Sequence, residues 1–280
     1  MAFPILVVNP NTTASMTLGV ERALAPIVAS SKFPSPTFFT APSGVPSINN
    51  DHDCHHTADV VLPHLLATPY APPTPTSPRL PSSLAHLSLA SAHSAILIAC
   101  YSVHPLVPLI ATHCASLPGP TRPVLGIFEA SLLASLALLH APEDRFGIVT
   151  TGAVWEGILG AGVRDFLGVR AGDDRARVDR FAGVETTGLS AVELHDMPAD
   201  EVERRMKAAV KRLIARARGA DGTGALKAVC LGCAGMAGLD ATVRAACVEQ
   251  LGDVEGAKVH IVDGVKAGYT LLEGLVRAQL

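Results

Sequence analysis

Two cysteines each stand at the end of an apolar run. Cys100 closes the run "AILIAC" and Cys233 closes "AVCLGC". A thiol has a reference pKa of about 8.5, so both its protonated and its ionised form are within reach near neutral pH. Inverting a carbon beside a carbonyl requires removal of a proton from one face and delivery of a proton to the other. Two facing thiols could do this, although each cysteine taken alone also fits a buried packing role.

The residues after each cysteine suit a site for a carbonyl compound. Ala234 and Gly235 follow Cys233, and such small residues leave backbone N–H groups free to approach a carbonyl oxygen that gains negative charge. Both cysteines also precede segments that can start helices, and a helix N-terminus stabilises a thiolate. We therefore expect these thiols to ionise more readily than an ordinary cysteine.

The composition excludes several classes of protein. The chain has 280 residues, 49% of them hydrophobic and 17% charged, with a formal net charge of -3. It lacks the basic block that binds nucleic acid, and no continuously apolar run reaches the roughly 18 residues that a membrane helix needs. Six cysteines without a secretory signal indicate reduced thiols. We expect a cytoplasmic protein with a small-molecule partner.

Short apolar runs separated by helical patterns must position these cysteines. Such alternation is typical of an α/β fold with a mostly parallel sheet, and continuously apolar strands need helices on both faces. The clearest helix runs from about Pro198 to Arg218, and Gly219 follows its basic last turn. The predicted strands are Pro4–Asn9, Ala95–Cys100, Val124–Phe128, Arg145–Thr151, Ala228–Cys233 and Lys258–Asp263.

The chain is expected to form two domains. Ligands of parallel sheets gather outside the carboxyl ends of the strands, so two half-chains that each offer one strand-end thiol could face each other across a cleft. The first domain is predicted to comprise residues 1–121 and 240–280, and the second residues 122–239. The proline-rich residues 68–81, "TPYAPPTPTSPRLP", predict an exposed insertion loop, with partner binding as the alternative.

Other cysteines invite different chemistry. The segment "DHDCHH", residues 51–56, offers carboxylates, a thiol and imidazoles, but it lacks the ligand spacing of a structural zinc site. We interpret it as a polar loop leading into a helix, with metal binding or a pocket contact as alternatives. Cys230 and Cys233 form a CxxC, but residues three apart on a strand point to opposite faces, so Cys230 is assigned to the core. Cys114 and Cys247 lie on apolar helical stretches and are predicted to be packing residues.

Short motifs follow one another along nearly the whole chain. They are "VVNPNTT" (residues 7–13), "IACYSVHPL" (98–106), "GIFEAS" (126–131), "FGIVTT" (146–151), "TTGLSAVEL" (186–194), Gly-Cys-Ala-Gly-Met (232–236) and "VDGV" (262–265). In this order they resemble the hydantoin racemase group of the aspartate/glutamate racemase superfamily. The Asn-Pro-Asn-Thr and Gly-Cys-Ala-Gly-Met motifs are the most specific.

This resemblance implies two similar αβα domains with mostly parallel four-stranded sheets and an active site in the interdomain cleft. It implies a cofactor-independent racemase of 5-substituted hydantoins or allantoin, without a metal, and we expect a homo-oligomer. Cys100 and Cys233 match the two catalytic cysteines, one removing the proton and the other delivering it. The implied substrate-binding residues are Asn11, Tyr101, Ser102, Thr150, Thr151, Ala234 and Gly235.

The chain departs from the family pattern after the first cysteine. Many relatives have acidic residues there, whereas this chain has Ser102, Val103 and His104. Removing negative charge beside Cys100 changes both its pKa and the substituent that the site accepts. His104 could donate a hydrogen bond to the substrate, support the thiolate or fix the loop. The alternative functions are an epimerase of another heterocyclic carbon acid in a biosynthetic pathway and a non-catalytic ureide-binding protein. Arylmalonate decarboxylation fits less well, because those relatives lack the first cysteine.

Overall fold

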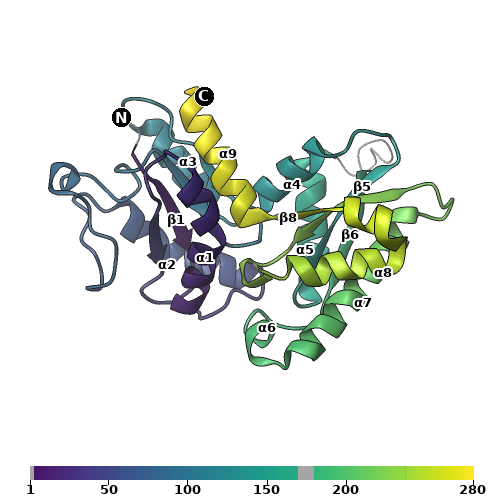
Figure 1. The fold of residues 1–280 in the computed structure, drawn as a ribbon. Helices are drawn as coiled ribbons and strands as arrows, with labels where there is room; N and C mark the ends of the chain where they lie inside the picture. Colours follow the sequence, from purple (N-terminus) through teal and green to yellow (C-terminus); the bar gives the residue numbers. More distant parts are fainter. Residues whose placement is uncertain (1–2, 170–179, 237) are drawn as a thin grey trace. The chain divides into compact units, whose positions relative to one another are not determined.

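The computed structural model describes residues 3–169, 180–236 and 238–280 (Figure 1). The chain forms two compact units. Unit 1 comprises the residues up to Ala130 together with Val265–Leu280, and unit 2 comprises Ser131–Gly264. Each unit contains one four-stranded sheet in which all neighbouring strands are parallel. This arrangement confirms the predicted fold class of two α/β domains with parallel four-stranded sheets.

Unit 1 is built on sheet A, whose strand order is β2-β1-β3-β4. Leu6 and Ile96 belong to the cluster of buried side chains that joins the sheet to α2 and α3. Leu97 points to the opposite face and contacts α9, where a Cβ on Gly268 would lie 2.5 Å from its Cδ1 atom. The elements are β1 (Ile5–Asn9), α1 (Ala14–Ser30), β2 (Thr37–Thr40), α2 (Asp51–Leu66), the 3₁₀ turn η1 (Ser82–Leu84), β3 (Ala95–Ile98), α3 (Leu106–Ser116), β4 (Val124–Gly126) and α9 (Gly264–Ala278).

Unit 2 is built on sheet B, whose strand order is β6-β5-β7-β8. The chain enters it within α4 and leaves it at the start of α9. No helix in the described part of the chain is both long and apolar enough to span a membrane. The elements are α4 (Ile127–Ala137), β5 (Asp144–Thr150), α5 (Val154–Phe166), β6 (Phe181–Thr186), α6 (Glu193–Asp196), α7 (Ala199–Arg218), β7 (Ala225–Leu231), the 3₁₀ turn η3 (Ala234–Met236), α8 (Asp240–Lys258) and β8 (His260–Asp263).

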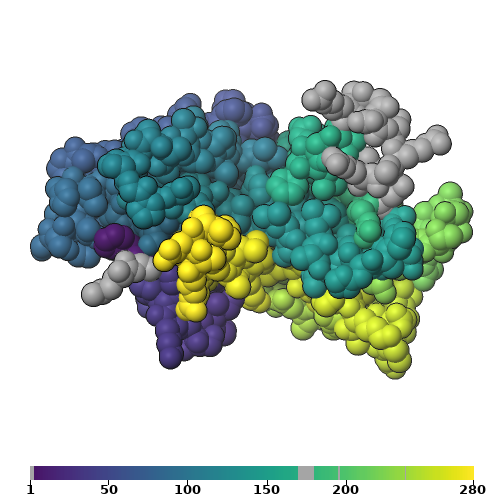
Figure 2. All heavy atoms as spheres, turned by 90° about the horizontal axis from the view of Figure 1, so that it is seen from above, coloured from purple at the N-terminus to yellow at the C-terminus, as the bar shows by residue number. Residues whose placement is uncertain are grey.

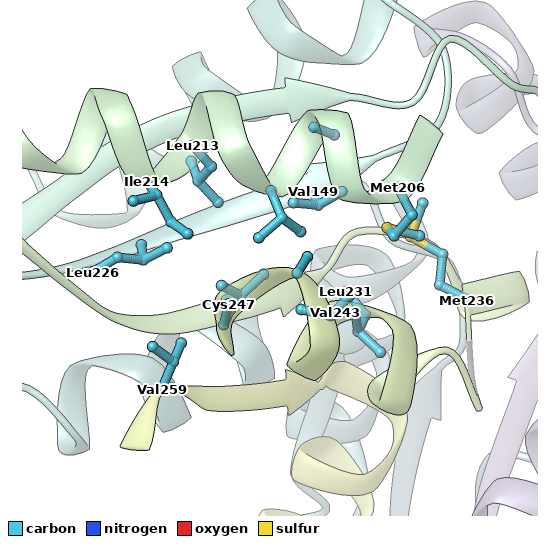
Figure 3. Close-up of a cluster of buried hydrophobic side chains, with 14 of the residues drawn as sticks. Val149, Met206, Leu213, Ile214, Leu226, Leu231, Met236, Val243, Cys247 and Val259 are labelled. Carbon is cyan, nitrogen blue, oxygen red and sulfur yellow. The ribbon is translucent and has the colours of Figure 1, made fainter. Parts of the chain in front are cut away.

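Helix α7 confirms the predicted helix and supplies much of the core of unit 2. Its apolar stripe is buried against sheet B and α8. Figure 3 shows Met206, Leu213 and Ile214 of this helix facing the side chains of the sheet and of α8. Cys247 on α8 is fully buried in the same cluster, so it is a packing residue, as predicted. The helix ends at Gly219, whose positive φ of 66° suits glycine.

Two edge strands were not predicted from the sequence. Strand β2 is only four residues long, and β6 lacks a continuous apolar run. Strand β6 is instead held to α7 by ion pairs of its own carboxylate. The buried carboxylate of Glu185 lies 2.6 Å from the Arg212 Nε atom and 3.3 Å from the Arg216 Nε atom, and both arginines belong to α7. An ion pair with a distant helix is invisible to a local sequence pattern.

Other boundaries also differ from the sequence prediction. Strand β4 ends at Gly126, because the predicted strand residues Ile127 and Phe128 begin α4. The expected loop at residues 51–56 is the first part of α2, where the Asn50 side chain accepts a hydrogen bond from the Asp53 N–H group at 2.9 Å. Strand β8 pairs with β7, and residues 240–264 lie in unit 2, whereas the prediction placed them in the first domain.

The proline-rich segment, residues 68–81, contains neither helix nor strand. Most of its side chains are exposed, and the segment contributes to the surface of unit 1 (Figure 2). Tyr70 is the exception. Its ring is buried, and its N–H group donates to the Leu87 carbonyl oxygen at 3.1 Å. One buried aromatic side chain thus fixes the start of an otherwise exposed loop.

Gly147 on β5 offers a test of the packing of α7. A Cβ on this residue would lie 2.5 Å from the Leu213 Cδ1 atom. We expect Gly147→Ala to lower the free energy of unfolding of unit 2 by about 1–3 kcal/mol because of this overlap. Leu213→Ala should lower it by about 2–5 kcal/mol by leaving a cavity. The double variant should lose less than the sum, because the new methyl group occupies part of that cavity.

Urea unfolding followed by the fluorescence of Trp155 measures these changes, because this single tryptophan is buried in unit 2. Gly157→Ala on α5 is the matched control. Nothing lies within 4 Å of its added Cβ, so it should be neutral or stabilising by up to about 1 kcal/mol. Strict additivity of Gly147→Ala and Leu213→Ala would contradict the packing described here.

Candidate active site

Cys100 lies at the carboxyl edge of sheet A, two residues after β3. Its side chain is half-buried, whereas Tyr101 and Ser102 are buried. The Tyr101 ring packs edge-on against Phe128 of α4, with a distance of 5.6 Å between ring centroids. The loop after β3 is therefore anchored by Tyr101. Ligands of parallel sheets bind at this edge.

A second thiol stands beside Cys100. The Ser102 Oγ atom lies 3.4 Å from the Cys100 Sγ atom and accepts a hydrogen bond from the Cys54 thiol, also at 3.4 Å. Cys54 belongs to the first part of α2 and is 1% exposed. Within the "DHDCHH" segment, Cys54 thus contacts the loop after β3. The helical start of α2 is what turns Cys54 inward.

His104 holds the same loop. Its Nδ1 atom accepts a hydrogen bond from the Leu106 N–H group at 3.2 Å, and its Nε2 atom lies 3.2 Å from the Thr57 Oγ1 atom. Burial, together with the nearby charge of His55, lowers the pKa of His104 to about 4. The ring is thus neutral near pH 7, and both of its nitrogen atoms are occupied by protein groups. Of the roles considered from the sequence, this geometry favours fixing the loop.

The Asn-Pro-Asn-Thr turn after β1 forms its own hydrogen-bond network. The Asn11 Oδ1 atom accepts hydrogen bonds from the Asn9 side-chain amide at 3.1 Å and from the Thr13 N–H group at 2.9 Å. The Asn11 Nδ2 atom has the Met16 sulfur as its partner at 3.3 Å, which is a weak acceptor. Asn11 is therefore held firmly through its oxygen, while its N–H groups are donors suited to a ligand carbonyl.

Glu129 was not singled out from the sequence. It lies in the first turn of α4, close after β4, and its Oε2 atom is buried without a hydrogen-bond partner among the described residues. Burial raises the pKa of this carboxyl, although the N–H groups of Gly126 and of Glu129 itself oppose that rise. The signal in the sequence was a single carboxylate in the apolar motif "GIFEAS" directly after a strand.

Cys233 occupies the corresponding place in unit 2, two residues after β7. The turn before it is fixed by Gly232, whose N–H group donates to the Val149 carbonyl oxygen at 2.7 Å and whose carbonyl oxygen accepts from the Thr150 hydroxyl at 2.6 Å. A Cβ on Gly232 would lie 2.6 Å from the Thr150 Cβ atom and 2.8 Å from the Val149 oxygen. Only glycine fits at this position.

The Cys233 thiol is held by backbone groups. Its Sγ atom accepts a hydrogen bond from the Gly235 N–H group at 3.3 Å. Burial raises the pKa of Cys233, and the N–H groups of Gly235 and Met236 oppose that rise without cancelling it. The expected easier ionisation of this thiol is therefore wrong. Ala234 opens η3, a turn of only three residues, so no long helix dipole acts on the sulfur at this point.

Cys230 points away from Cys233. Its Sγ atom lies 3.1 Å from the Ser135 Oγ atom on α4, whereas Cys233 packs against the cluster formed by α7 and α8. The CxxC thus diverges across sheet B, as the strand geometry predicted. Cys114 is buried on α3, and burial raises its pKa, as befits a packing residue.

Thr150 and Thr151 lie at the end of β5 and are both buried. The Thr150 hydroxyl donates its proton to Gly232, as described above, so its contribution is to brace the turn before Cys233. The Thr151 carbonyl oxygen accepts the Gly188 N–H group at 3.1 Å. These residues hold the carboxyl edge of sheet B in shape.

Metal ligands do not gather in the described residues, where no group of three or more His, Cys, Asp or Glu side chains could hold an ion. At the start of α2, the His55 Nε2 atom lies 3.7 Å from an Asp51 carboxylate oxygen, and both side chains are exposed.

The chain is similar to known proteins over almost its whole length. The family model Asp/Glu/Hydantoin racemase matches residues 5–272. An uncharacterized protein of Schizosaccharomyces pombe is 30% identical over 280 residues, which is 99% of this chain and 93% of the relative. The allantoin racemase from Pseudomonas fluorescens aligns with a TM-score of 0.67 at 26% identity, covering 99% of this chain and 92% of that one.

The allantoin racemase from Klebsiella pneumoniae also has a TM-score of 0.67, at 24% identity, covering all of this chain and 89% of that one. This second likeness concerns the fold alone. The family match extends over almost the whole chain and includes both strand-end cysteines, Cys100 and Cys233. The chain therefore belongs to the Asp/Glu/Hydantoin racemase family of isomerases.

Proposed function

We propose that the protein is a cofactor-independent racemase of a five-membered cyclic ureide, with allantoin and 5-substituted hydantoins as the substrate class. The observation that carries this proposal is that each unit places one half-buried thiol, Cys100 or Cys233, directly after a central strand. The full-length similarity to the Pseudomonas fluorescens allantoin racemase supports the choice of substrate. Assembly as a homo-oligomer and a cytoplasmic location stay predictions from the sequence.

The reaction is a transfer of protons between sulfur and carbon. One thiolate removes the proton from the stereogenic carbon, so that a C–H bond breaks, an S–H bond forms and the electron pair moves onto the neighbouring carbonyl oxygen. The other thiol then gives its proton to the opposite face of the same carbon, so that its S–H bond breaks and a new C–H bond forms. No electrons are gained or lost, and the opposite enantiomer reverses the roles of Cys100 and Cys233.

The negative charge on the carbonyl oxygen needs hydrogen-bond donors. The backbone N–H group of Ala234 and the side-chain amide of Asn11 are suited to this role, because preorganised donors stabilise such an oxygen. The Gly235 N–H group instead donates to the Cys233 sulfur. Ser102 and the neutral His104 replace the acidic residues of many relatives, which favours a substrate without positive charge near Cys100. This same substitution is the observation that favours the second candidate, an epimerase of another neutral heterocycle.

Single enantiomers of allantoin and of 5-substituted hydantoins, incubated with the protein in deuterated water, test this function. We expect loss of optical rotation together with uptake of one deuteron at the stereogenic carbon, measured by polarimetry and NMR against a sample without protein. Cys100→Ser and Cys233→Ser should each lower kcat by about 10²–10⁴-fold, because each removes one acid–base group. Cys247→Ser, which alters a buried thiol in the core of unit 2, is the control and should keep most activity.

Each other outcome is informative. Absence of exchange with all these compounds would overturn the ureide proposal. Deuterium uptake without inversion would point to chemistry on one face only. Full racemisation by Cys100→Ser or by Cys233→Ser would refute the two-thiol mechanism even if the substrate were correct.

Thr150→Val tests whether the turn before Cys233 must be held in place. The variant keeps the shape of the side chain but removes the hydroxyl that donates to the Gly232 carbonyl oxygen. We expect kcat to fall by about tenfold, because small displacements of a reacting group are costly, and the stability of unit 2 to fall by about 1–3 kcal/mol. Thr150→Ser keeps the donor and should restore most of the rate. An unchanged kcat in Thr150→Val would show that the hydroxyl has no part in positioning Cys233.

A further inference from the structure

Three polar side chains meet at the carboxyl edge of sheet A, and only two of them belong to the motif after β3. Cys100 and Ser102 are two residues apart, whereas Cys54 comes from α2, far away in the sequence. The Ser102 hydroxyl lies 3.4 Å from each sulfur atom. The Cys54 and Cys100 thiols are also hydrogen-bonded to each other. This triad of Cys54, Cys100 and Ser102 contains a second thiol, which the proton transfer at Cys100 does not itself require.

A hydroxyl group can donate one proton and accept others. Ser102 can therefore accept the Cys54 thiol proton while donating its own proton to the Cys100 sulfur. The direct hydrogen bond between the two thiols offers a second route. When one proton leaves this group, the negative charge that remains is stabilised by donors on both sides.

We propose that Cys54 is a positioning residue for the reaction, which shares one proton with Cys100, directly and through Ser102, and so keeps a thiolate available at the edge of sheet A. The role of Cys54 in the reaction rests on the proposed function, but the shared proton can be measured without any substrate. Because the two thiols are coupled, the first ionisation belongs to the pair and not to either cysteine alone.

The two thiols differ in their surroundings. The hydrogen bonds with Cys100 and Ser102 lower the pKa of Cys54, and burial and the carboxylates of Asp51 and Asp53 oppose this fall without cancelling it. Cys54 is 1% exposed, whereas Cys100 is half-buried and so better solvated. Better solvation lowers the cost of a negative charge on Cys100, so the pair can place its shared charge on either sulfur.

The other titratable groups described near this edge are two histidines and one carboxyl group. His104 faces α2 from the loop before α3, and its lowered pKa of about 4 keeps it neutral near pH 7. His55 lies on the exposed side of α2. Glu129, which follows β4, has a raised pKa and can only add negative charge. The hydrogen bonds with Cys54 and Ser102 are contacts that can stabilise a Cys100 thiolate.

The two strand-end thiols differ in the groups that act on them. Burial raises the pKa of Cys233, which favours the thiol there, whereas the pair of Cys54 and Cys100 shares a proton. We therefore expect the enantiomer whose proton faces Cys100 to react without a preceding proton exchange with solvent.

Alkylation of Cys100 by iodoacetamide across pH tests this inference without any substrate. Site-resolved mass spectrometry follows the modification of Cys100 alone. We expect Cys54→Ala to shift the midpoint of the reaction upward by about one pH unit, which lowers the rate near pH 7 by about tenfold, because the thiolate is the reacting form. Cys54→Ser keeps a hydroxyl donor and should give an intermediate midpoint. Cys114→Ala, a second buried cysteine of unit 1 without this contact, should leave the midpoint unchanged.

Circular dichroism melting curves verify that each variant is folded, and Cys54→Ser serves if Cys54→Ala does not fold. An unchanged or lowered midpoint in the folded variant would overturn the shared proton. The acidic limb of kcat/KM on allantoin should move by the same amount as the alkylation midpoint. A shifted midpoint in a protein that racemises no ureide would retain the proton sharing and reject only the proposed function.

Discussion

Both strand-end thiols of the candidate site depend on the parallel pairing of the two central strands in each sheet. In sheet A the register pairs Val8 with Ile98, and in sheet B it pairs Val149 with Leu231. Because parallel strands end at the same edge, this register brings the Asn-Pro-Asn-Thr turn to the edge where Cys100 lies, and Thr150 to the edge where Cys233 lies. A slip of one residue would turn each buried side chain to the wrong face of its sheet.

The central strands and α7 could be predicted because their signal is local. Continuous apolar runs mark strands buried on both faces, and the stripe of α7 repeats at the helical period. The edge strands β2 and β6 and the contact of Cys54 with Ser102 could not be predicted in this way. Strand β6 depends on arginines of α7, and Cys54 reaches Ser102 only through the packing of α2 on sheet A. Such features arise from tertiary contacts between distant segments.

The two strand-end thiols are similar in sequence context but differ in the groups that surround them. Cys100 is accompanied by side chains, a hydroxyl and a second thiol, each of which can give or take a proton. Cys233 is accompanied by backbone N–H groups, which can only donate. The protonation of Cys100 can therefore be altered by substituting neighbouring side chains, whereas the environment of Cys233 is set mainly by the path of the main chain.

The turn at Gly232 separates two kinds of constraint that stand side by side in the sequence. Glycine is required there by close contact with Thr150 and Val149, whatever reaction the protein carries out. The neighbouring Cys233 has its role in the proposed mechanism. In that mechanism, a related chain that kept the glycine but replaced the cysteine would keep the turn and lose one of the two proton carriers. The presence of the glycine in a related chain would thus indicate the same fold, whereas the cysteine next to it would indicate the proposed activity.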